Sequence, residues 1–495
     1  MSSPSGYQAA NRSELVAIAV IVIAAFTIRL VNLDASLWYD EIITLVQSVR
    51  LPSAELIKTY GSLNNHVLYT WLAKGFSAVF GETPAALRFP AVVFGAASIL
   101  AVWRLFRLDG LKWAAVSAAA LLAVSYHHVW FSQNARGYTG LLLFTTLAAY
   151  YFSRALKSHT YRDWILYGLS IAIAMLLHLS AAFFVAAQGL TVICAAIVVS
   201  RREGMSQLGV WLRGPALGYV LGAAIVIAIF SPMLAGMAAT LGSVSSAGAD
   251  ATRQVLDWRN PLWTLFESLK SFGVLSFAFP LAFGFIVLGV VRLLERGRWI
   301  IIPYLIHIPL TFIVLTSLSM RVWPRYFFVD IGFMFAALVV GAFWFAEIAA
   351  KYLKSADRTG LSDVRLKALG VAVMIGASLP LLMTNFRRPK QDFDGAYAMI
   401  ERNASEADIK VALGLSSVFF NDYRGLNWPS PQSVDEFRSL EEHGGRVWVV
   451  TAFPAHARAY YREIQSELDK EFELMGRFSG TLSGGEVTVY RSAVK

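Results

Sequence analysis

Long apolar stretches recur through most of the chain, and no other feature restricts its possible folds as strongly. A helix needs roughly 20 apolar residues to cross the ~30 Å hydrocarbon core of a bilayer. Such stretches recur between residues 15 and 384 and stop after Asn385. The composition agrees, because 56% of the 495 residues are hydrophobic and only 15% are charged, whereas soluble proteins are about a quarter charged. We therefore predict a polytopic α-helical membrane protein with a small C-terminal soluble α/β domain.

These stretches predict about eleven transmembrane helices. The predicted spans are 15–31, 86–106, 112–130, 138–156, 163–178, 180–200, 213–236, 272–293, 299–319, 326–347 and 366–384. The first is interpreted as a retained helix, because it lacks a strongly basic leader and a small-residue cleavage site. The single cysteine, Cys194, lies in an apolar run, so no disulfide framework is possible and no thiol-based metal site is suggested.

The distribution of basic residues orients the chain. If the ambiguous apolar segment from His66 to Phe80 does not cross the membrane, all basic clusters fall on one side, which is cytoplasmic by the positive-inside rule. These clusters are Arg104/Arg107/Lys112, Arg154/Lys157/Arg162, Arg201/Arg202, Arg292/Arg296/Arg298 and Lys351/Lys354/Arg358. The segment is therefore predicted to be a juxtamembrane or re-entrant helix. The net charge of +10 follows from this topology and does not indicate nucleic acid binding.

Residue 385 divides the predicted domains. Residues 1–385 form the transmembrane domain, with a long external loop at 32–85, and 386–495 form a soluble extracytoplasmic domain. Helical patterns in the second part are Phe393–Arg402, Ser417–Tyr423, Val434–Glu442 and His456–Leu468, and strand-like runs are Ile409–Leu413, Val447–Thr451 and Val487–Tyr490. This part has no phosphate-binding or metal-binding motif, so we assign it no chemistry.

Two adjacent carboxylates follow the first span, in the sequence Trp38-Tyr39-Asp40-Glu41. A solvated loop with aromatic residues at the membrane interface would explain this motif. A carboxylate at the membrane surface is also what deprotonates an acceptor hydroxyl, provided that its pKa is raised or the proton transfer is concerted. Asp40 is the candidate for that role.

Arginines occur on the predicted outer side at two places. Arg136 lies in the segment 131–138 (FSQNARGY), between the third and fourth predicted spans. Its side chain either extends to the lipid headgroups or binds a phosphate. The planar guanidinium group can donate two parallel hydrogen bonds to phosphate oxygens. Arg321 and Arg325 begin a later span against the positive-inside bias, and they need a negative partner such as a phosphate or the two carboxylates.

Several histidines lie near the predicted outer ends of spans. Asn65 is a candidate cap for the helix that begins at His66, and this histidine either packs or hydrogen-bonds a sugar or phosphate. His178 and the pair His127-His128 are intramembrane ionisable residues and hence functional candidates. Adjacent residues of a helix point about 100° apart, so the pair cannot hold one metal ion, and we predict no metal site.

Taken together, these segments resemble the lipid-donor glycosyltransferases of the GT-C fold. The closest likeness is to the branch with the dolichyl-phosphate-mannose protein O-mannosyltransferases and the bacterial transferase that adds aminoarabinose to lipid A. The matching pieces, in the family's order, are Trp38-Tyr39-Asp40-Glu41, Asn65-His66-Val67-Leu68-Tyr69, Arg88-Phe89-Pro90 with Phe94-Gly95, Phe131-Ser132-Gln133 with Ala135-Arg136-Gly137-Tyr138, and Arg325-Tyr326. The chain departs from the pattern at Val67, where relatives carry proline. Its C-terminal part does not resemble a lectin-like insert, so protein mannosylation is not favoured.

The resemblance implies transfer of a monosaccharide from a polyprenyl-phosphate donor to a hydroxyl outside the membrane, with inversion. Asp40 would be the general base, Glu41 would orient it or the acceptor, and Arg136 and Arg325 would neutralise the leaving phosphate. Other residues expected at the donor or acceptor are Asn65, His66, Tyr69, Gln133, Tyr138, His178, Arg321 and Tyr326. Arg88 is grouped with them, and its expected role is to hold the juxtamembrane segment against the bundle.

The implied partners are membrane lipid, a polyprenyl-phosphate sugar and a glycolipid, polysaccharide or protein acceptor, in a bacterial inner membrane with the active face periplasmic. No cofactor is predicted, because one Asp-Glu pair supplies too few oxygen ligands to hold a divalent ion. A transporter or flippase is the main alternative, but the sequence shows no inverted repeats or paired broken helices. A non-catalytic scaffold is the third possibility, and the joint presence of Asp40, Glu41, Arg136 and Arg325 argues against it.

Overall fold

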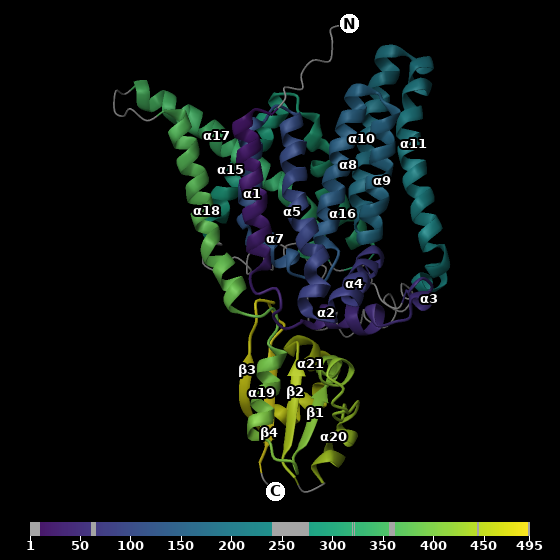
Figure 1. The fold of residues 1–495 in the computed structure, drawn as a ribbon, viewed down its shortest axis with the longest axis vertical. Coiled ribbons are helices and arrows are strands. Elements are labelled where there is room, and N and C mark those ends of the chain that lie inside the picture. Colours follow the sequence, from purple (N-terminus) through teal and green to yellow (C-terminus); the bar gives the residue numbers. More distant parts are fainter. Residues whose placement is uncertain are drawn as a thin grey trace.

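The computed structural model describes residues 10–60, 66–239, 277–318, 320, 322–355, 362–442 and 445–493. These residues form a bundle of long helices and a small α/β domain attached to one end of the bundle (Figure 1). The first helix, α1, begins at the opposite end of the bundle from this domain (Figure 1). The chain is thus a polytopic helical membrane protein with a C-terminal α/β domain, as predicted.

A helix lies in each predicted span. The bundle helices are α1 (Arg12–Leu30), α5 (Pro84–Leu108), α6 (Lys112–Val124), α7 (Tyr126–Ser132), α8 (Tyr138–Ser158), α9 (Tyr161–Leu177), α10 (Ala181–Glu203), α11 (Met205–Phe230), α15 (Phe279–Glu295), α16 (Ile302–Ser317), α17 (Ile331–Ser355) and α18 (Asp363–Arg387). Within the described ranges, seven helices are long and apolar enough to cross a membrane, or up to eight with a bent pair. The helices α9 and α15 have only 17 residues each, which is at the lower limit for a transmembrane helix. The number of about eleven crossings therefore stays a prediction.

The predicted span 112–130 is not one continuous helix. It is broken between α6 and α7, whose axes differ by 61°. Ser125 has an extended backbone at the break, and its hydroxyl accepts the N–H of His128 and so caps α7. Arg29 of α1 reaches the break and donates to the carbonyl of Ala123, one of the groups that the interrupted helix leaves without a partner.

Short helical elements connect α1 to α5. They are α2 (Tyr39–Thr44), η1 (Leu45–Val49), α3 (Ser53–Leu56) and α4 (Val67–Phe80), and α2 and α4 lie at the bundle end nearest this domain (Figure 1). A helix of 14 residues such as α4 is only about 21 Å long. It is therefore too short to cross a bilayer unaided, consistent with a juxtamembrane position.

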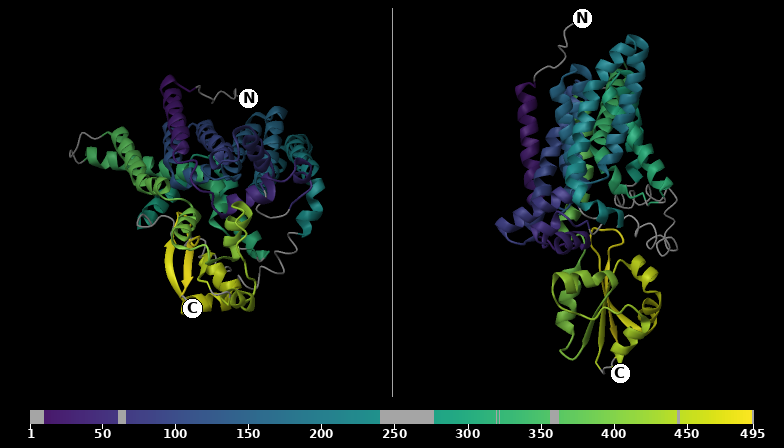
Figure 2. Two further views of the ribbon diagram at one scale, coloured as in Figure 1. Left: turned by 60° about the horizontal axis from the view of Figure 1, so that its bottom comes forward. Right: turned by 90° about the vertical axis from the view of Figure 1, so that its right-hand side faces the viewer.

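The α/β domain contains a four-stranded sheet with helices on either side (Figure 2). Its strands are β1 (Ile409–Leu413), β2 (Val447–Ala452), β3 (Phe472–Phe478) and β4 (Val487–Ser492), in the order β1-β2-β4-β3, with β1 and β2 parallel and the other pairs antiparallel. Its helical segments are α19 (Phe393–Asn403), η7 (Val418–Tyr423), α20 (Val434–Glu441), α21 (Pro454–Tyr460) and α22 (Arg462–Glu471).

One sequence prediction for this domain was wrong, and one strand was missed. The predicted helix 456–468 is two helices, because the chain turns at Tyr461. Strand β3 was not predicted, and its residues are half-buried or exposed, because it lies at the edge of the sheet. An edge strand lacks the continuous apolar pattern of a buried strand, so its sequence carries little strand signal.

Candidate active site

The predicted site residues come from separate elements that converge at the end of the bundle facing the α/β domain. They lie on α2, just before and within α4, near the start of α5, between the end of α7 and the start of α8, and on η5 (Pro324–Asp330) before α17. The last residue of this set, His178, follows α9. Asn65 and Arg321 lie outside the described residues.

Asp40 faces two arginines without a close hydrogen bond to either. Its side chain is 12% exposed, and Oδ2 lies 3.6 Å from Nη1 of Arg325 and 4.0 Å from Nη2 of Arg136. Both distances exceed the usual hydrogen-bond range. These contacts are ion pairs, and they place two positive charges beside a single carboxylate.

Glu41 is in the opposite situation, because donors surround its buried carboxylate. Arg88 donates to both oxygens, from Nε at 2.8 Å and from Nη2 at 2.6 Å. The backbone N–H groups of Ala135, at 2.7 Å, and Trp38, at 3.2 Å, complete the set. Burial alone would raise the pKa of Glu41, but Arg88, Lys390 and the Ala135 N–H outweigh it and hold the pKa below its usual value. The carboxylate is therefore ionised and already fully engaged.

Arg88 also shapes the chain that leads into α2. Besides Glu41, its guanidinium donates to the carbonyl oxygens of Leu33, Ala35 and Ser36 at 2.5–2.8 Å. These bonds fix the segment between α1 and α2, so the single side chain of Arg88 holds both the entry to α2 and its second carboxylate. The expected role of Arg88 in holding the juxtamembrane segment against the bundle stays a prediction.

The two arginines beside Asp40 are held by different neighbours. Arg136 is buried, and its Nη1 donates to the hydroxyl of Thr44 at 3.1 Å. The guanidinium of Arg325 lies 5.0 Å from the centre of the Trp323 ring, and its side chain is 30% exposed. Tyr326 follows it on η5 and is half-buried. Both guanidinium groups face the carboxylate of Asp40, and two neighbouring positive charges attract an anion such as a phosphate.

Three aromatic rings pack beside these arginines. The His66 ring lies edge-on to Tyr138 at 5.3 Å and to His178 at 4.7 Å, measured between centroids. Nδ1 of His66 is 2.9 Å from the carbonyl oxygen of Leu177 and 3.1 Å from the N–H of Gly137. Burial and the nearby Arg136 hold the pKa of His66 well below its usual value, so the ring is neutral.

Gly137 makes this packing possible. A Cβ atom at this position would lie 2.3 Å from the carbonyl oxygen of Leu177 and 2.8 Å from Nδ1 of His66. No larger residue fits without displacing the neighbouring chain. The small residue in the 131–138 segment therefore brings the backbone before α8 against both His66 and the end of α9.

Two other predicted site residues are engaged in holding elements together. The hydroxyl of Tyr69 donates to the carbonyl of Leu87 at 2.8 Å and joins α4 to α5. Gln133 donates to the carbonyls of Arg29 and Val31, at 3.1 and 2.6 Å, and accepts from Asn385 at 2.8 Å. Gln133 thus joins the end of α7 to α1 and α18.

The structure adds buried polar contacts that the sequence reasoning missed, including those of the candidate His128. Arg29 donates to Ser132 and contacts His128, whose other ring nitrogen contacts Ser98. His307 pairs with Asp330 at 2.9 Å and joins α16 to η5. An arginine inside an apolar span needs a buried polar partner, and this signal was available for Arg29 in the span 15–31.

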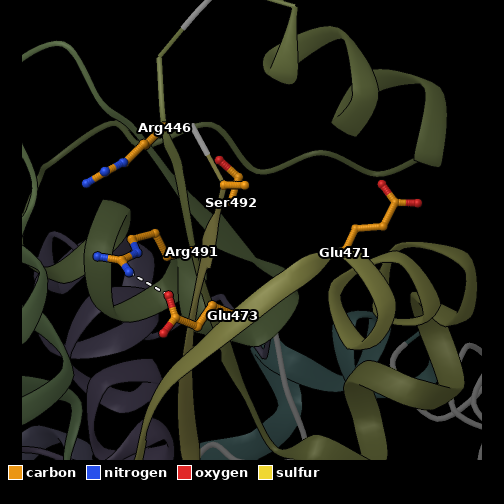
Figure 3. Close-up of a pocket in the computed structure, with 6 residues that line it drawn as sticks. Arg446, Glu471, Glu473, Arg491 and Ser492 are labelled. Atoms are coloured by element: carbon orange, nitrogen blue, oxygen red, sulfur yellow. Dashed lines mark hydrogen bonds and ion pairs between the residues drawn. The ribbon is translucent and has the colours of Figure 1, made fainter. Parts of the chain in front are cut away.

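Metal binding finds no support in the described ranges, because no group of three or more His, Cys, Asp or Glu residues there could hold an ion. A pocket of about 180 Å³ occurs at the end of the α/β domain that points away from the bundle, next to Ser492 (Figures 1 and 3). Its lining arginines and glutamates balance in charge, and Arg491 pairs with Glu473 (Figure 3). We assign this pocket no role.

Comparison with known proteins identifies the fold. A family model described as dolichyl-phosphate-mannose-protein mannosyltransferase matches residues 65–235, and no curated protein matches the chain significantly. The structure of ArnT from Cupriavidus metallidurans bound to undecaprenyl phosphate is 13% identical, with a TM-score of 0.50 over 98% of this chain and 99% of that one. The oligosaccharyltransferase AglB from Archaeoglobus fulgidus, in complex with an inhibitory peptide and a dolichol-phosphate, is 13% identical, with a TM-score of 0.51 over 98% of this chain and 74% of that one.

A third similar structure is the S. cerevisiae protein O-mannosyltransferase Pmt1-Pmt2 complex bound to the sugar donor. It is 18% identical, with a TM-score of 0.38, and the match covers 46% of this chain and only 34% of that chain. The fold assignment therefore depends on the two matches that extend over nearly the whole of this chain. The chain has the fold of the GT-C glycosyltransferases, and it resembles the branch of protein O-mannosyltransferases and ArnT.

Proposed function

We propose that the protein transfers a monosaccharide from a polyprenyl-phosphate donor to a hydroxyl acceptor at the outer face of a bacterial inner membrane. The acceptor is a glycolipid, a polysaccharide or a protein. The observation that carries this proposal is the position of Asp40 between Arg136 and Arg325, 4.0 and 3.6 Å away. A base next to two phosphate-binding cations is the set of groups that this transfer needs.

The reaction is a single displacement at the anomeric carbon. The acceptor oxygen forms a bond to this carbon while the bond from the carbon to the phosphate oxygen breaks, which inverts the configuration. The acceptor proton passes to the carboxylate of Asp40. The negative charge that develops on the leaving polyprenyl phosphate is balanced by Arg136 and Arg325.

The loose ion pairs of Asp40 give the donor phosphate a second effect. Without the donor, Arg136 and Arg325 both pair with the carboxylate of Asp40. When the phosphate binds, it competes for the same guanidinium groups, and the carboxylate is released from this pairing to accept a hydrogen bond from the acceptor hydroxyl. Donor binding therefore activates the base, which limits reaction in the absence of donor.

The neighbouring carboxylate has a supporting role in this proposal. Glu41 is fully buried and receives donors on both oxygens, so it cannot accept the substrate proton without losing these bonds. It instead joins α2 to α5 through Arg88 and to the turn before Arg136 through Ala135. Glu41 thus positions the base and the phosphate clamp with respect to each other.

The structural neighbours support the choice of donor. ArnT was crystallised with undecaprenyl phosphate and AglB was determined with a dolichol-phosphate, and both are lipid phosphates. A polyprenyl tail dissolves only in lipid, whereas the sugar must meet an acceptor exposed to water. A site where the bundle meets an extramembrane domain satisfies both requirements.

The test is mass spectrometry of glycolipids and surface polysaccharides from a deletion strain complemented with wild type or Asp40→Asn. We expect one product to lose a single sugar unit in the deletion strain, wild type to restore it, and Asp40→Asn to fail. The mass lost identifies the sugar. Full restoration by Asp40→Asn contradicts the base assignment, and unchanged glycans in the deletion strain contradict transfer and favour a transporter.

A further inference from the structure

The segment between α18 and α19 runs through the contact between the bundle and the α/β domain, and it carries two buried polar side chains. Lys390 is 8% exposed, and its ammonium donates to the backbone carbonyl oxygen of Gln133. The same ammonium lies 5.4 Å from the centre of the Trp130 ring. Lys390 thus holds the end of α7 and the start of the turn that leads to Arg136.

Gln391 makes the matching contact with the helix that carries Asp40. Its side chain is fully buried, and its amide oxygen accepts the backbone N–H of Tyr39 at 3.1 Å. The first N–H groups of a helix have no partner within the helix, so Gln391 satisfies one of them immediately before Asp40. The amide nitrogen of Gln391 donates to the carbonyl of Gly485 at 2.7 Å, which ties this contact to the loop between β3 and β4.

That loop holds the segment from the other side. The N–H groups of Thr481 and Leu482 donate to the carbonyls of Pro389 and Lys390, both at 2.9 Å. A Cβ atom at Gly480 would lie 2.1 Å from the Lys390 carbonyl oxygen, so the approach requires glycine. The hydroxyl of Thr481 also accepts the indole N–H of Trp130 at 3.0 Å. The α/β domain thus fixes Lys390 and Gln391 from its own loop.

Apolar packing continues across the same boundary. One buried cluster includes Leu37, which precedes α2, and Ile42 of α2, together with Phe393 and Phe420 of the α/β domain. The ring of Tyr39 lies edge-on to Phe453 at 5.3 Å. The two parts therefore share a hydrophobic core at α2, in addition to the covalent connection between α18 and α19.

We infer that Lys390 and Gln391 are positioning residues. Through them the α/β domain sets the geometry between α2, which carries the base Asp40, and the arginine turn, which is the turn between α7 and α8 that carries Arg136. This inference rests on the proposed function, because it assigns the two residues to the transfer reaction. Gln391 acts on Asp40 through the first turn of α2. Lys390 acts on Arg136 through the carbonyl of Gln133. The domain is then an obligatory part of the active site, although neither residue touches substrate.

The protonation state of Lys390 makes this arrangement depend on pH. The charged groups that act on its ammonium are Glu41 of α2 and Arg88 of α5. Burial, together with Arg88, lowers the pKa of Lys390 to about 7, although Glu41 opposes the shift. The ammonium is therefore protonated below this pH and loses its charge as the pH rises through it. An arginine at the same position keeps its charge throughout this range.

The experiment compares Lys390→Met, Lys390→Arg and Gln391→Leu with the matched control Lys410→Met, whose ammonium pairs with Glu401 at the surface of the same domain. Membranes of the deletion strain supply the acceptor, and a radiolabelled polyprenyl-phosphate sugar of the identified mass is the donor. Undecaprenyl phosphate is the probe for binding to the purified proteins. Thermal unfolding of each purified variant is recorded alongside.

Misplacement of a reacting group lowers kcat while leaving donor binding largely intact. We expect kcat to fall about 10- to 100-fold in Lys390→Met and Gln391→Leu, with the Kd for undecaprenyl phosphate within about threefold of wild type. Lys390→Arg should recover most of the rate and move the decline in rate above pH 7 to higher pH. Lys410→Met should match wild type.

Two results overturn the inference while leaving the proposed function intact. One is a wild-type kcat in both Lys390→Met and Gln391→Leu. The other is a fall in kcat that only mirrors lost folded protein, with the pH profile of Lys390→Arg unchanged from wild type. If wild type itself transfers no sugar, the proposed function fails, and the inference fails with it.

Discussion

Close ion pairs occur at both ends of the helix bundle, but a loosely paired carboxylate, Asp40, lies at the end that faces the α/β domain. At the end away from the α/β domain, Glu14 pairs with Arg107 at 2.7 Å and Asp109 pairs with Lys157 at 2.7 Å. At the other end Asp40 lies 3.6 Å or more from its two arginines. Close pairs hold helices together, whereas a carboxylate shared loosely between two cations remains available to react.

The same contrast separates two neighbouring residues on α2. Glu41 is fully buried and bound on both oxygens, while Asp40 faces its arginines without a close hydrogen bond. Sequence alone places the two carboxylates together and does not distinguish them. The difference arises because successive helical residues point about 100° apart, so that one faces Arg88 and the other faces Arg136 and Arg325.

The largest effect is expected from breaking the close pair at the site. Arg88→Met leaves Glu41 buried without its partner and frees three backbone carbonyls, so we expect the free energy of unfolding to fall by about 3–5 kcal/mol. Thermal unfolding in detergent measures it. The double variant Arg88→Met/Glu41→Leu should recover part of the loss, because the uncompensated charge is gone. A single variant as stable as wild type would show that the pair is not structural.

The ion pairs of Asp40 with Arg136 and Arg325 are loose, so we expect their removal to change the rate of sugar transfer rather than folding. Arg136→Met and Arg325→Met should each lower kcat for transfer about 100- to 1,000-fold, because each removes a cation from the developing phosphate charge. The measurement is the initial rate in membranes with equal amounts of protein. Arg154→Met is the control, because Arg154 pairs with Asp163 and is 41% exposed. An equal loss in the control would point to a general effect of removing an arginine.

A smaller effect is expected from the packing behind the arginine turn. Gly137→Ala places a Cβ atom 2.3 Å from the carbonyl oxygen of Leu177, so we expect a loss of about 1–3 kcal/mol of stability, together with slower transfer. Gly75 of α4 has nothing within 4 Å of such an atom. Gly75→Ala should instead gain about 0.5–1 kcal/mol from higher helix propensity. Equal unfolding temperatures for the two variants would contradict the packing argument.

The smallest effect is expected at a surface pair of the α/β domain. Lys410 pairs with Glu401 at 2.7 Å, and their side chains are 22% and 43% exposed. Lys410→Met should change the free energy of unfolding by at most about 1 kcal/mol, because solvent screens such pairs. Chemical denaturation of the purified protein measures it. A loss comparable to that of Arg88→Met would mean that distance alone, and not burial, sets the value of a pair.

Much of the fold was predictable because the bilayer imposes helix length and hydrophobicity. The break at Ser125 was not, since residues 112–130 contain no glycine or proline to mark it, and the partner that stabilises the break, Arg29, lies on another helix. The candidate site was predictable as a set of residue types. Their pairing was not, because Glu41 meets Arg88 only through the fold. Lys390 and Gln391 lie in a short connecting segment without a recognisable motif, so only the three-dimensional contacts reveal them.

The most direct test of the central claim measures transfer and lipid-phosphate binding on the same preparations of wild type and Asp40→Asn. If Asp40 is the base and competes with the phosphate for Arg136 and Arg325, Asp40→Asn should transfer at least about 100-fold more slowly while binding undecaprenyl phosphate more tightly. A variant that transfers at the wild-type rate, or that loses lipid-phosphate binding along with transfer, would contradict the account.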